Sequence, residues 1–221
     1  MSLKSYLKWI LVKLGKKSTQ VTGNPEPVLN YAFHNSTMGH NCAIGKDCYV
    51  YNTKIGDYTY LSSAVSVMNT AIGKFCSVAQ GACISLGMHP SSTFVSTHPA
   101  FFSLNKQNGM TFSDQNYFAE MGETKIGNDV WVGVNAIIMD NITIGNGAII
   151  GAGAVVTQNI PAYAIAVGIP AKVIKYRFEK DEIEFLENFK WWDKDHDWLK
   201  NNFKDLHDIK LFMKKHAAVS G

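Results

Sequence analysis

An apolar residue recurs at every sixth position over much of the second half of the chain, and this period constrains the fold strongly. From Thr124 onward six such positions follow in unbroken register, and glycine comes directly after four of them. They are Ile126, Val132, Ile138, Ile144, Ile150 and Val156. Six residues match neither the 3.6-residue period of a helix nor the two-residue alternation of a long strand. The period is typical of short strands joined by turns and stacked as a solenoid.

The first half of the chain carries the same pattern with occasional five-residue steps. Its apolar positions are Ile44, Val50, Ile55, Leu61, Val67, Ile72, Val78 and Ile84. Three hexads make one triangular coil, and stacked coils pair their strands in parallel about 4.8 Å apart. The fourteen positions predict between four and five coils around a column of Ile and Val. An antiparallel sandwich would need turn signals at longer spacing.

Three of the four cysteines stand two places before an apolar position, where Ala, Thr or Val stand in other hexads. They are Cys42, Cys48 and Cys76, and Cys83 falls outside this pattern. Free cysteine packs as a small buried hydrophobe, so packing explains these residues better than a disulfide or a zinc site does. Free thiols in a chain without a secretory signal favour a cytoplasmic protein.

Composition excludes some classes of protein and leaves the N-terminus open to two interpretations. A net charge of +3 without a concentrated basic stripe argues against nucleic-acid binding. Residues 1–20 place Leu and Ile at helical spacing among lysines, which predicts an amphipathic helix too short to span a bilayer. It is expected to pack on the protein or a neighbouring subunit, or to contact an anionic membrane surface peripherally.

The hexad register lapses over residues 86–122, inside a column expected to span residues 30–175. The segment holds His89-Pro90, His98-Pro99 and an aromatic group of Phe101, Phe102, Phe112, Tyr117 and Phe118. Long irregular loops within a compact repeat are uncommon and usually functional, so we expect the site here. Residues 176–221 are predicted to be a helical cap over the last coil, with its final helix capped by Asp197.

Three signatures in the second half resemble those of a known group. They are Ile126-Gly-Asn-Asp-Val-Trp-Val-Gly133, Gly151-Ala-Gly-Ala-Val-Val-Thr157 and Val167-Gly-Ile-Pro-Ala-Lys-Val-Ile-Lys175. With them the chain resembles the xenobiotic acyltransferase branch of the hexapeptide-repeat acetyltransferases, which includes streptogramin and class B chloramphenicol acetyltransferases. The resemblance implies an all-β solenoid, specifically a left-handed parallel β-helix with an inserted loop. It also implies a homotrimer with active sites between subunits, acetyl-CoA as co-substrate and no metal.

The resemblance also assigns candidate site residues. By family position His89 is the general base, and His98 is its rival and contacts the acceptor. His34 and His40 are expected to line the first coil, and His34 is also kept as a lesser candidate for contact with the acceptor. Coenzyme A would contact Trp131, Gly133, Val134, Ala152 and Thr157 along its pantetheine arm, and Lys172 and Lys175 at phosphate. For Val134 and Ala152 the alternative is simple coil packing, and for the lysines it is a solvated face.

The loop departs from the antibiotic-modifying members because it is longer and more aromatic. Loops of the form His-Pro-x-x-x-x-x-Ser-Thr-His-Pro, present here over residues 89–99, resemble those of sugar acetyltransferases of surface polysaccharide synthesis. We therefore expect O-acetylation of a sugar or polysaccharide precursor, with antibiotic acetylation or a non-catalytic trimeric scaffold as alternatives. A zinc carbonic anhydrase on the same fold is disfavoured, because the spacings of His34 to His40 and His89 to His98 do not match its histidine pair.

Overall fold

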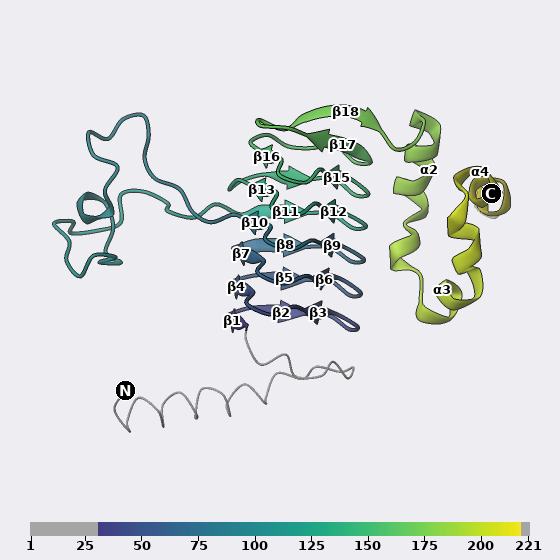
Figure 1. Cartoon of the computed structure of the whole chain (residues 1–221), viewed down its shortest axis with the longest axis horizontal. Helices are drawn as coiled ribbons and strands as arrows, with labels where there is room; N and C mark the ends of the chain where they lie inside the picture. The colour runs from purple at the N-terminus through teal and green to yellow at the C-terminus, as the bar shows by residue number, and fades with distance from the viewer. Residues whose placement is uncertain (1–30, 218–221) are drawn as a thin grey trace, which may run out of the picture.

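A computed structural model of the chain describes residues 31–217, and its central feature is a column of short strands (Figure 1). The amphipathic helix expected over residues 1–20 lies outside the described residues. The strands form three sheets that run the length of the column, called here sheets A, B and C. Within residues 31–217, every strand pair is parallel except β17 with β18. The fold is therefore the predicted solenoid of stacked hexapeptide coils, a parallel β-helix.

Each coil contributes one short strand or bridge to each sheet in turn. Sheet A contains β1 (Ala32–His34), β4 (Tyr49–Tyr51), β7 (Ser66–Met68), β10 (Cys83–Ile84), β13 (Ile137–Ile138) and β16 (Val155–Val156). Sheet B contains β2 (Thr37–Met38), β5 (Lys54–Ile55), β8 (Thr70–Ile72), β11 (Thr124–Ile126) and β14 (Thr143–Ile144). Sheet C contains β3 (Ala43–Ile44), β6 (Tyr60–Leu61), β9 (Ser77–Val78), β12 (Trp131–Val132), β15 (Ile149–Ile150), β17 (Ala164–Val167) and β18 (Lys172–Tyr176).

The six strands of sheet A among the described residues correct the estimate of four to five coils. The count was too low, although the expected span of residues 30–175 includes the first coil, because its inward residues Phe33 and Met38 are not the Ile and Val that were counted in later hexads. The last coil places Ile160 and Ala166 inside, after the glycine signature has ended. Burial of the predicted positions is nearly complete: Val50, Val67, Val78 and Ile150 are each 0% exposed.

The corners explain why a six-residue repeat can turn three times per coil. Asn35, Asn52 and Asn69 occupy equivalent corners between sheets A and B, each in the left-handed backbone region that asparagine tolerates better than most residues. Their side-chain amides bond to one another as a ladder along the column. Glycine is required where coils approach most closely, since a Cβ on Gly73 would lie 2.5 Å from the carbonyl oxygen of Gly127.

The cysteine prediction is confirmed by burial and by hydrogen bonding. Cys42, Cys48 and Cys76 are buried in the column, and all four cysteines of the chain are free. The Cys76 Sγ lies 3.0 Å from the carbonyl oxygen of Gly127, so the thiol also donates a hydrogen bond to the backbone. These residues fill the inward small-side-chain position, as the hexad pattern indicated.

The C-terminal elements pack along the side of the column rather than over its end (Figure 1). They are α2 (Lys180–Phe189), η3 (Trp191–Asp193), α3 (His196–Asn202), η4 (Phe203–His207) and α4 (Ile209–His216). Their contacts reach several coils: His196 meets Tyr58, Asp193 pairs with Lys74, and Glu187 accepts from Asn146. The edge of sheet C is instead covered by β18, which folds back antiparallel on β17.

The cap of the helix after η3 also differs from the expectation. Asp195, not Asp197, is the N-cap of α3, and its Oδ1 accepts from the Trp198 N–H at 2.7 Å. Asp197 lies within the first turn, where its charge still favours the helix N-terminus. The single final helix that we expected is divided into α3, η4 and α4, because Asp208 starts a new helix.

Candidate active site

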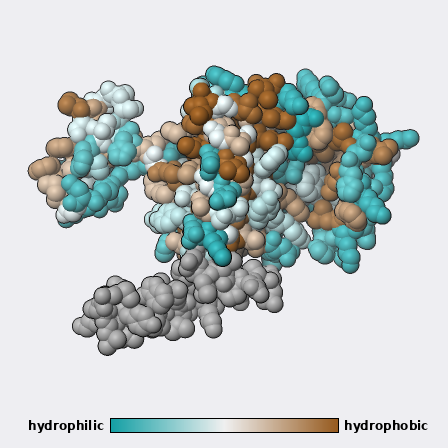
Figure 2. Space-filling view, viewed as in Figure 1, coloured by the Kyte–Doolittle hydropathy of each residue, from teal (hydrophilic) through white to brown (hydrophobic). Residues whose placement is uncertain are grey.

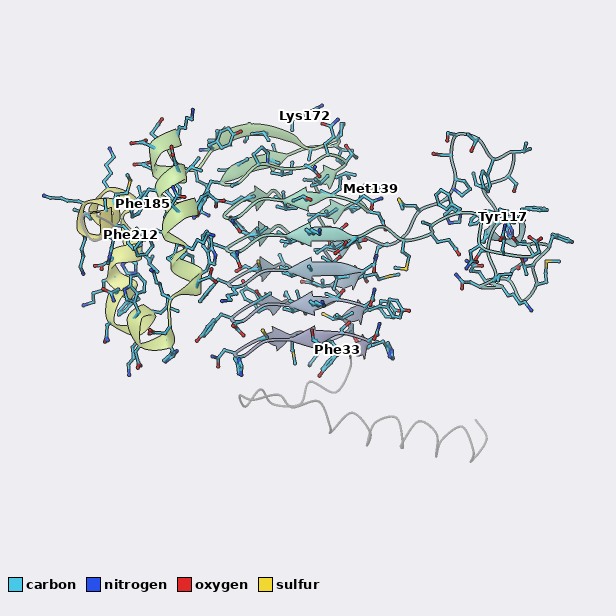
Figure 3. All side chains as sticks on the ribbon, turned by 180° about the vertical axis from the view of Figure 1, so that it is seen from behind. Phe33, Tyr117, Met139, Lys172, Phe185 and Phe212 are labelled. Atoms are coloured by element: carbon cyan, nitrogen blue, oxygen red, sulfur yellow. The ribbon has the colours of Figure 1, made fainter. Side chains whose placement is uncertain are left out.

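The long loop leaves the column at the corner between sheets A and B, from the end of β10 to the start of β11 (Figures 1 and 3). Tyr117, labelled in Figure 3, lies well away from the column in the distal part of this loop. The distal part has an apolar centre of its own, in which Phe102 is 0% exposed. The rings of Phe94 and Phe118 meet Phe102 edge-on at 6.0 and 5.6 Å between centroids. This aromatic centre can hold neighbouring side chains in place.

His89 lies on this aromatic centre, with its ring edge-on to Phe102 at 6.2 Å between centroids. Its Nδ1 is 2.7 Å from the backbone carbonyl oxygen of Thr97. A carbonyl oxygen can only accept, so Nδ1 carries the proton and Nε2 of the neutral ring keeps its lone pair. The residue is exposed. The geometry therefore presents an unprotonated imidazole nitrogen outside the loop, which is the state that a general base requires.

His98 has the opposite arrangement. It is the N-cap of the short 3₁₀ helix η2 (Pro99–Phe101), and its Nδ1 accepts from the Ala100 N–H at 3.2 Å. A backbone N–H can only donate, so the proton of neutral His98 is on Nε2. The second nitrogen of His98 is therefore a hydrogen-bond donor, suited to holding an oxygen atom and unsuited to removing a proton.

His34, the other candidate for contact with the acceptor, lies on the first coil. It ends β1, and sheet A places β4 and β7 between β1 and β10, where the loop begins. Three strand steps of about 4.8 Å separate His34 from the base of the loop by roughly 14 Å along the column. The structure does not bring His34 to the base of the loop within one chain.

Most of the predicted coenzyme residues gather on sheet C and the corner beside it. The pairing register aligns Trp131 with Ile149, Ile149 with Ile165 and Ile165 with Lys175. These four residues form an outward ladder whose two ends, Trp131 and Lys175, are exposed. Lys172 lies in the same strand as Lys175. The ladder is an apolar track of about 14 Å that ends in positive charge.

The corner after β12 continues this track on adjacent coils. A Cβ on Gly133 would lie 2.5 Å from the Ala152 nitrogen, so glycine is what lets the two coils approach. Val134 is exposed, and its carbonyl accepts from the Gly153 N–H at 2.8 Å. Thr157 is separate from this group, since it follows β16 in sheet A and is exposed there. Sheet C and the loop occupy different sides of the column, so one chain does not bring His89 to the ladder.

Exposed apolar residues also cover part of the column surface, as Figure 2 shows over its upper coils. They include Val134, Ile137, Met139, Ile169, Val173 and Ile174. Between residues 31 and 217 no three His, Cys, Asp or Glu side chains are grouped to hold a metal ion. In that same part of the chain no helix is long and apolar enough to cross a membrane.

Comparison with known proteins places this architecture in a family. The family model for bacterial transferase hexapeptide (six repeats) matches residues 123–158. The chain is 36% identical over 181 residues to a chloramphenicol acetyltransferase from Morganella morganii, covering 73% of this chain and 85% of that one. The chain belongs to the hexapeptide-repeat acetyltransferases. It is thus an acyltransferase enzyme, and the scaffold alternative is set aside.

Other relatives of this acetyltransferase differ in their named acceptors. A chloramphenicol acetyltransferase from Agrobacterium fabrum is 41% identical over 129 residues, which span 55% of this chain and 58% of that protein. The galactoside O-acetyltransferase of Escherichia coli K12 is 30% identical over 156 residues, spanning 70% and 63% respectively. An N-acyltransferase from Bacillus cereus, solved with dTDP and coenzyme A, shares the fold with a TM-score of 0.58 at 20% identity, covering 73% of this chain and 84% of that chain.

Sequence reasoning missed two parts of the site. The Thr97 carbonyl, which sets the proton position on His89, is a backbone group, so no side-chain pattern marks it. Phe94 was also left out of the aromatic group, although it packs on Phe102 and Phe118. The spacing of Phe94 from the histidines carries no signal, because the loop has no regular period.

Proposed function

We propose that this acetyltransferase moves an acetyl group from acetyl-CoA to a hydroxyl of a small acceptor, with His89 as general base. The observation that carries the proposal is the Nδ1 contact of His89 with Thr97, which leaves Nε2 free to take a proton. As the acceptor oxygen attacks the thioester carbonyl carbon, its proton passes to Nε2. Collapse of the tetrahedral intermediate breaks the carbon–sulfur bond, and the departing thiolate takes the proton from the imidazolium.

The proposed coenzyme site is the ladder on sheet C with its adjoining corner. Trp131, Gly133, Val134 and Ala152 offer an apolar track for the pantetheine arm, and Lys172 and Lys175 offer charge for phosphate. Thr157 would contact the arm from the neighbouring face. Because His89 and the ladder lie on different sides of one column, the site is complete only where the loop of one subunit meets the ladder of another. A homotrimer supplies such contacts, and we propose that assembly.

For the acceptor we propose a sugar or polysaccharide precursor. The loop exposes the rings of Phe101 and Phe112, which stack at 5.3 Å between centroids, beside the N–H donor of His98. Aromatic faces with nearby hydrogen-bond donors suit a ring that is apolar on its C–H face and polar at its rim. The similarity to a galactoside O-acetyltransferase agrees with this choice. Antibiotic acetylation is the second candidate, because of the similarity to chloramphenicol acetyltransferases.

The role of His89 is tested by paired alanine variants. His89→Ala should lower kcat by about 10²–10⁴ while the KM for acetyl-CoA changes little, because general-base catalysis contributes that factor. His98→Ala, the matched control in the same loop, should act mainly on the KM of the acceptor. Thiol release from acetyl-CoA measures both. A severe loss of kcat in His98→Ala with a mild effect in His89→Ala would reverse the assignment.

The coenzyme site is tested by charge removal. Lys175→Gln should weaken binding of coenzyme A by up to about fivefold, because a solvent-exposed ion pair contributes about 0.2–1 kcal/mol. Lys54, an exposed lysine on sheet B, provides the matched control, and Lys54→Gln should leave binding unchanged. Isothermal titration with coenzyme A measures both. Equal affinities for the two variants would remove Lys175 from the site.

The acceptor class is tested by competition. A methyl galactoside, N-acetylglucosamine and chloramphenicol are offered separately with acetyl-CoA, and kcat/KM is compared. A higher kcat/KM for a sugar supports the proposal, and a higher value for chloramphenicol supports the antibiotic alternative.

A further inference from the structure

Both legs of the loop are bound by one side chain where they leave the column. Asp140 follows β13 and is 8% exposed. Its Oδ1 accepts from the Ser85 hydroxyl and from the Gly122 N–H, each at 3.0 Å. Its Oδ2 accepts from the Gly87 N–H at 3.0 Å. Ser85 and Gly87 belong to the outgoing leg and Gly122 to the returning leg, so the carboxylate joins the two.

The carboxylate stands at the corner where the asparagine ladder is interrupted. Asn69 is the last asparagine of the ladder before the loop in the sequence. Its side-chain amide donates to the Gly122 carbonyl instead of to another asparagine. The equivalent corner of the next coil is Ser85, which keeps the left-handed conformation at φ 52° but cannot extend the ladder. Met139, the neighbour of Asp140, is labelled at this place in Figure 3. Asp140 therefore accepts from the donors of the opened corner: the buried Gly122 N–H, the half-buried Gly87 N–H, and the buried Ser85 hydroxyl, which also lies 3.3 Å from the Gly122 carbonyl oxygen.

Residues 85–88 and 120–122 form the neck of the loop, where its two legs leave the column. The hydrogen bonds of the neck are made by residues that directly precede His89 in the sequence. Gly87 has φ 108°, a conformation that L side chains rarely adopt, and its N–H is held by Asp140. The next residue, Met88, donates its N–H to the Glu120 carbonyl at 2.7 Å, which keeps the two legs paired. His89 follows at once. A shift of the neck therefore changes where the imidazole is presented.

We propose that Asp140 is a positioning residue for acetyl transfer: its carboxylate fixes the neck of the loop and thereby the place of His89. This inference rests on the proposed role of His89 as the base. Asp140 does not exchange a proton with the acceptor, because its oxygens are occupied by Ser85, Gly87 and Gly122. A displacement of a catalytic group by about 1 Å can lower the rate by about 10²-fold.

The test compares Asp140→Asn with Asp57→Asn. Each aspartate precedes a left-handed corner residue, Asn141 at φ 62° and Tyr58 at φ 61°, and each accepts a backbone N–H. Asp57 is far from the loop in sequence and in the column, so its variant controls for the loss of a corner carboxylate. Asp140→Asn replaces one acceptor by an N–H donor, which loses a neck bond while preserving volume.

We expect Asp140→Asn to lower kcat about 10–100-fold, with the KM for acetyl-CoA within about threefold of the unmodified enzyme. Asp57→Asn should keep full kcat. Thiol release from acetyl-CoA is followed with a methyl galactoside, N-acetylglucosamine and chloramphenicol as acceptors. The pH profile of kcat should keep its midpoint, because the base is unchanged. An unchanged kcat in Asp140→Asn would overturn the inference.

The double variant His89→Ala with Asp140→Asn separates this inference from the proposal on which it rests. If Asp140 acts through His89, the double variant is no slower than His89→Ala alone. Additive losses would mean that Asp140 acts independently and would overturn the inference. Full activity of His89→Ala would instead overturn the proposed base.

Two further measurements keep the inference testable if Asp140→Asn folds poorly or no acceptor is turned over. Ser85→Ala removes a single hydroxyl from the neck and should lower kcat about 3–10-fold at unchanged KM for acetyl-CoA, consistent with one lost hydrogen bond. Hydrogen exchange needs no acceptor, and the Met88 amide should exchange at least about tenfold faster in either neck variant than in Asp57→Asn. Unchanged exchange in Ser85→Ala and Asp140→Asn would overturn the inference.

Discussion

Removal of Arg177 tests how the segment after β18 is fastened to the column. Its Nη1 donates to the Asp129 Oδ2 at 3.0 Å and to the Gly147 carbonyl at 2.7 Å. The guanidinium also lies 5.0 Å from the centre of the Phe178 ring. The two side chains of the ion pair are 27% and 29% exposed. Arg177→Met keeps most of the side-chain volume and removes the charge and its hydrogen bonds.

The expected loss follows from the partial burial of the pair. Breaking a fully buried pair costs about 3–5 kcal/mol, whereas exposed pairs contribute about 0–1 kcal/mol. Discounting the buried figure for the solvent that reaches both side chains gives about 2–3 kcal/mol. For a chain of this length, each kcal/mol lowers Tm by about 2–4 °C, so the variant should melt about 4–12 °C lower. Lys74→Met, which breaks the more exposed pair with Asp193, is the control and should lose at most about 1 kcal/mol.

The same variant has a pH dependence whose sign can be worked out. Burial raises the pKa of Asp129, and the charge of Arg177 acts against that rise. A carboxyl with a raised pKa binds its proton more tightly in the folded state, so its contribution to stability falls as pH rises through the folded pKa. Without Arg177 the pKa of Asp129 rises further, and the loss in Tm should be larger at pH 8 than at pH 5. Thermal melts followed by circular dichroism measure this. A larger loss at pH 5, or a loss below about 1 °C at pH 8, would refute the reasoning.

Two other predictions concern buried groups. The Tyr163 hydroxyl is buried without a hydrogen-bond partner among residues 31–217, and burial raises its pKa; since an unpaired buried polar group costs about 1–3 kcal/mol, Tyr163→Phe should melt at the same temperature or higher. A fall of more than about 3 °C would mean that the hydroxyl is bonded in solution. Burial raises the pKa of the Cys76 thiol to about 12, so mass spectrometry after treatment with a thiol reagent at pH 8 should find Cys76 modified only in unfolded protein. Its modification in the native protein would contradict the packing described.

The column could be predicted from sequence because each coil repeats the same physical requirement. Ile126, Val132 and Ile138 show it through period and side-chain type alone, and the structure buries all three. The number of coils was underestimated because Phe33 and Met38 fill the first coil with other side chains. The pattern was followed through buried Ile, Val and Leu, so inward positions occupied by other residues were left out of the count.

The site was only partly predictable for a related reason. The loop was located because the period lapses, and His89 was singled out by resemblance. The proton positions on His89 and His98 depend on a carbonyl and an N–H of the backbone, which carry no sequence signal. The path of the C-terminal helices was likewise hidden, because contacts such as Glu187 with Asn146 join positions 41 residues apart. Amphipathic spacing indicates that one face of a helix is buried. It does not indicate against which face of the column the helix packs.

Insertion of the loop at a corner leaves the pairing of the column intact on both sides. β10 pairs with β7 and β13, and β11 pairs with β8 and β14, as if residues 85–123 were a short turn. Residues 85–123 can therefore be replaced by another loop without any change in the hexads that form the column. Under the proposed function, in which this loop contacts the acceptor, a different loop would change the acceptor and leave the column as it is. Two relatives are named for different acceptors, chloramphenicol and a galactoside.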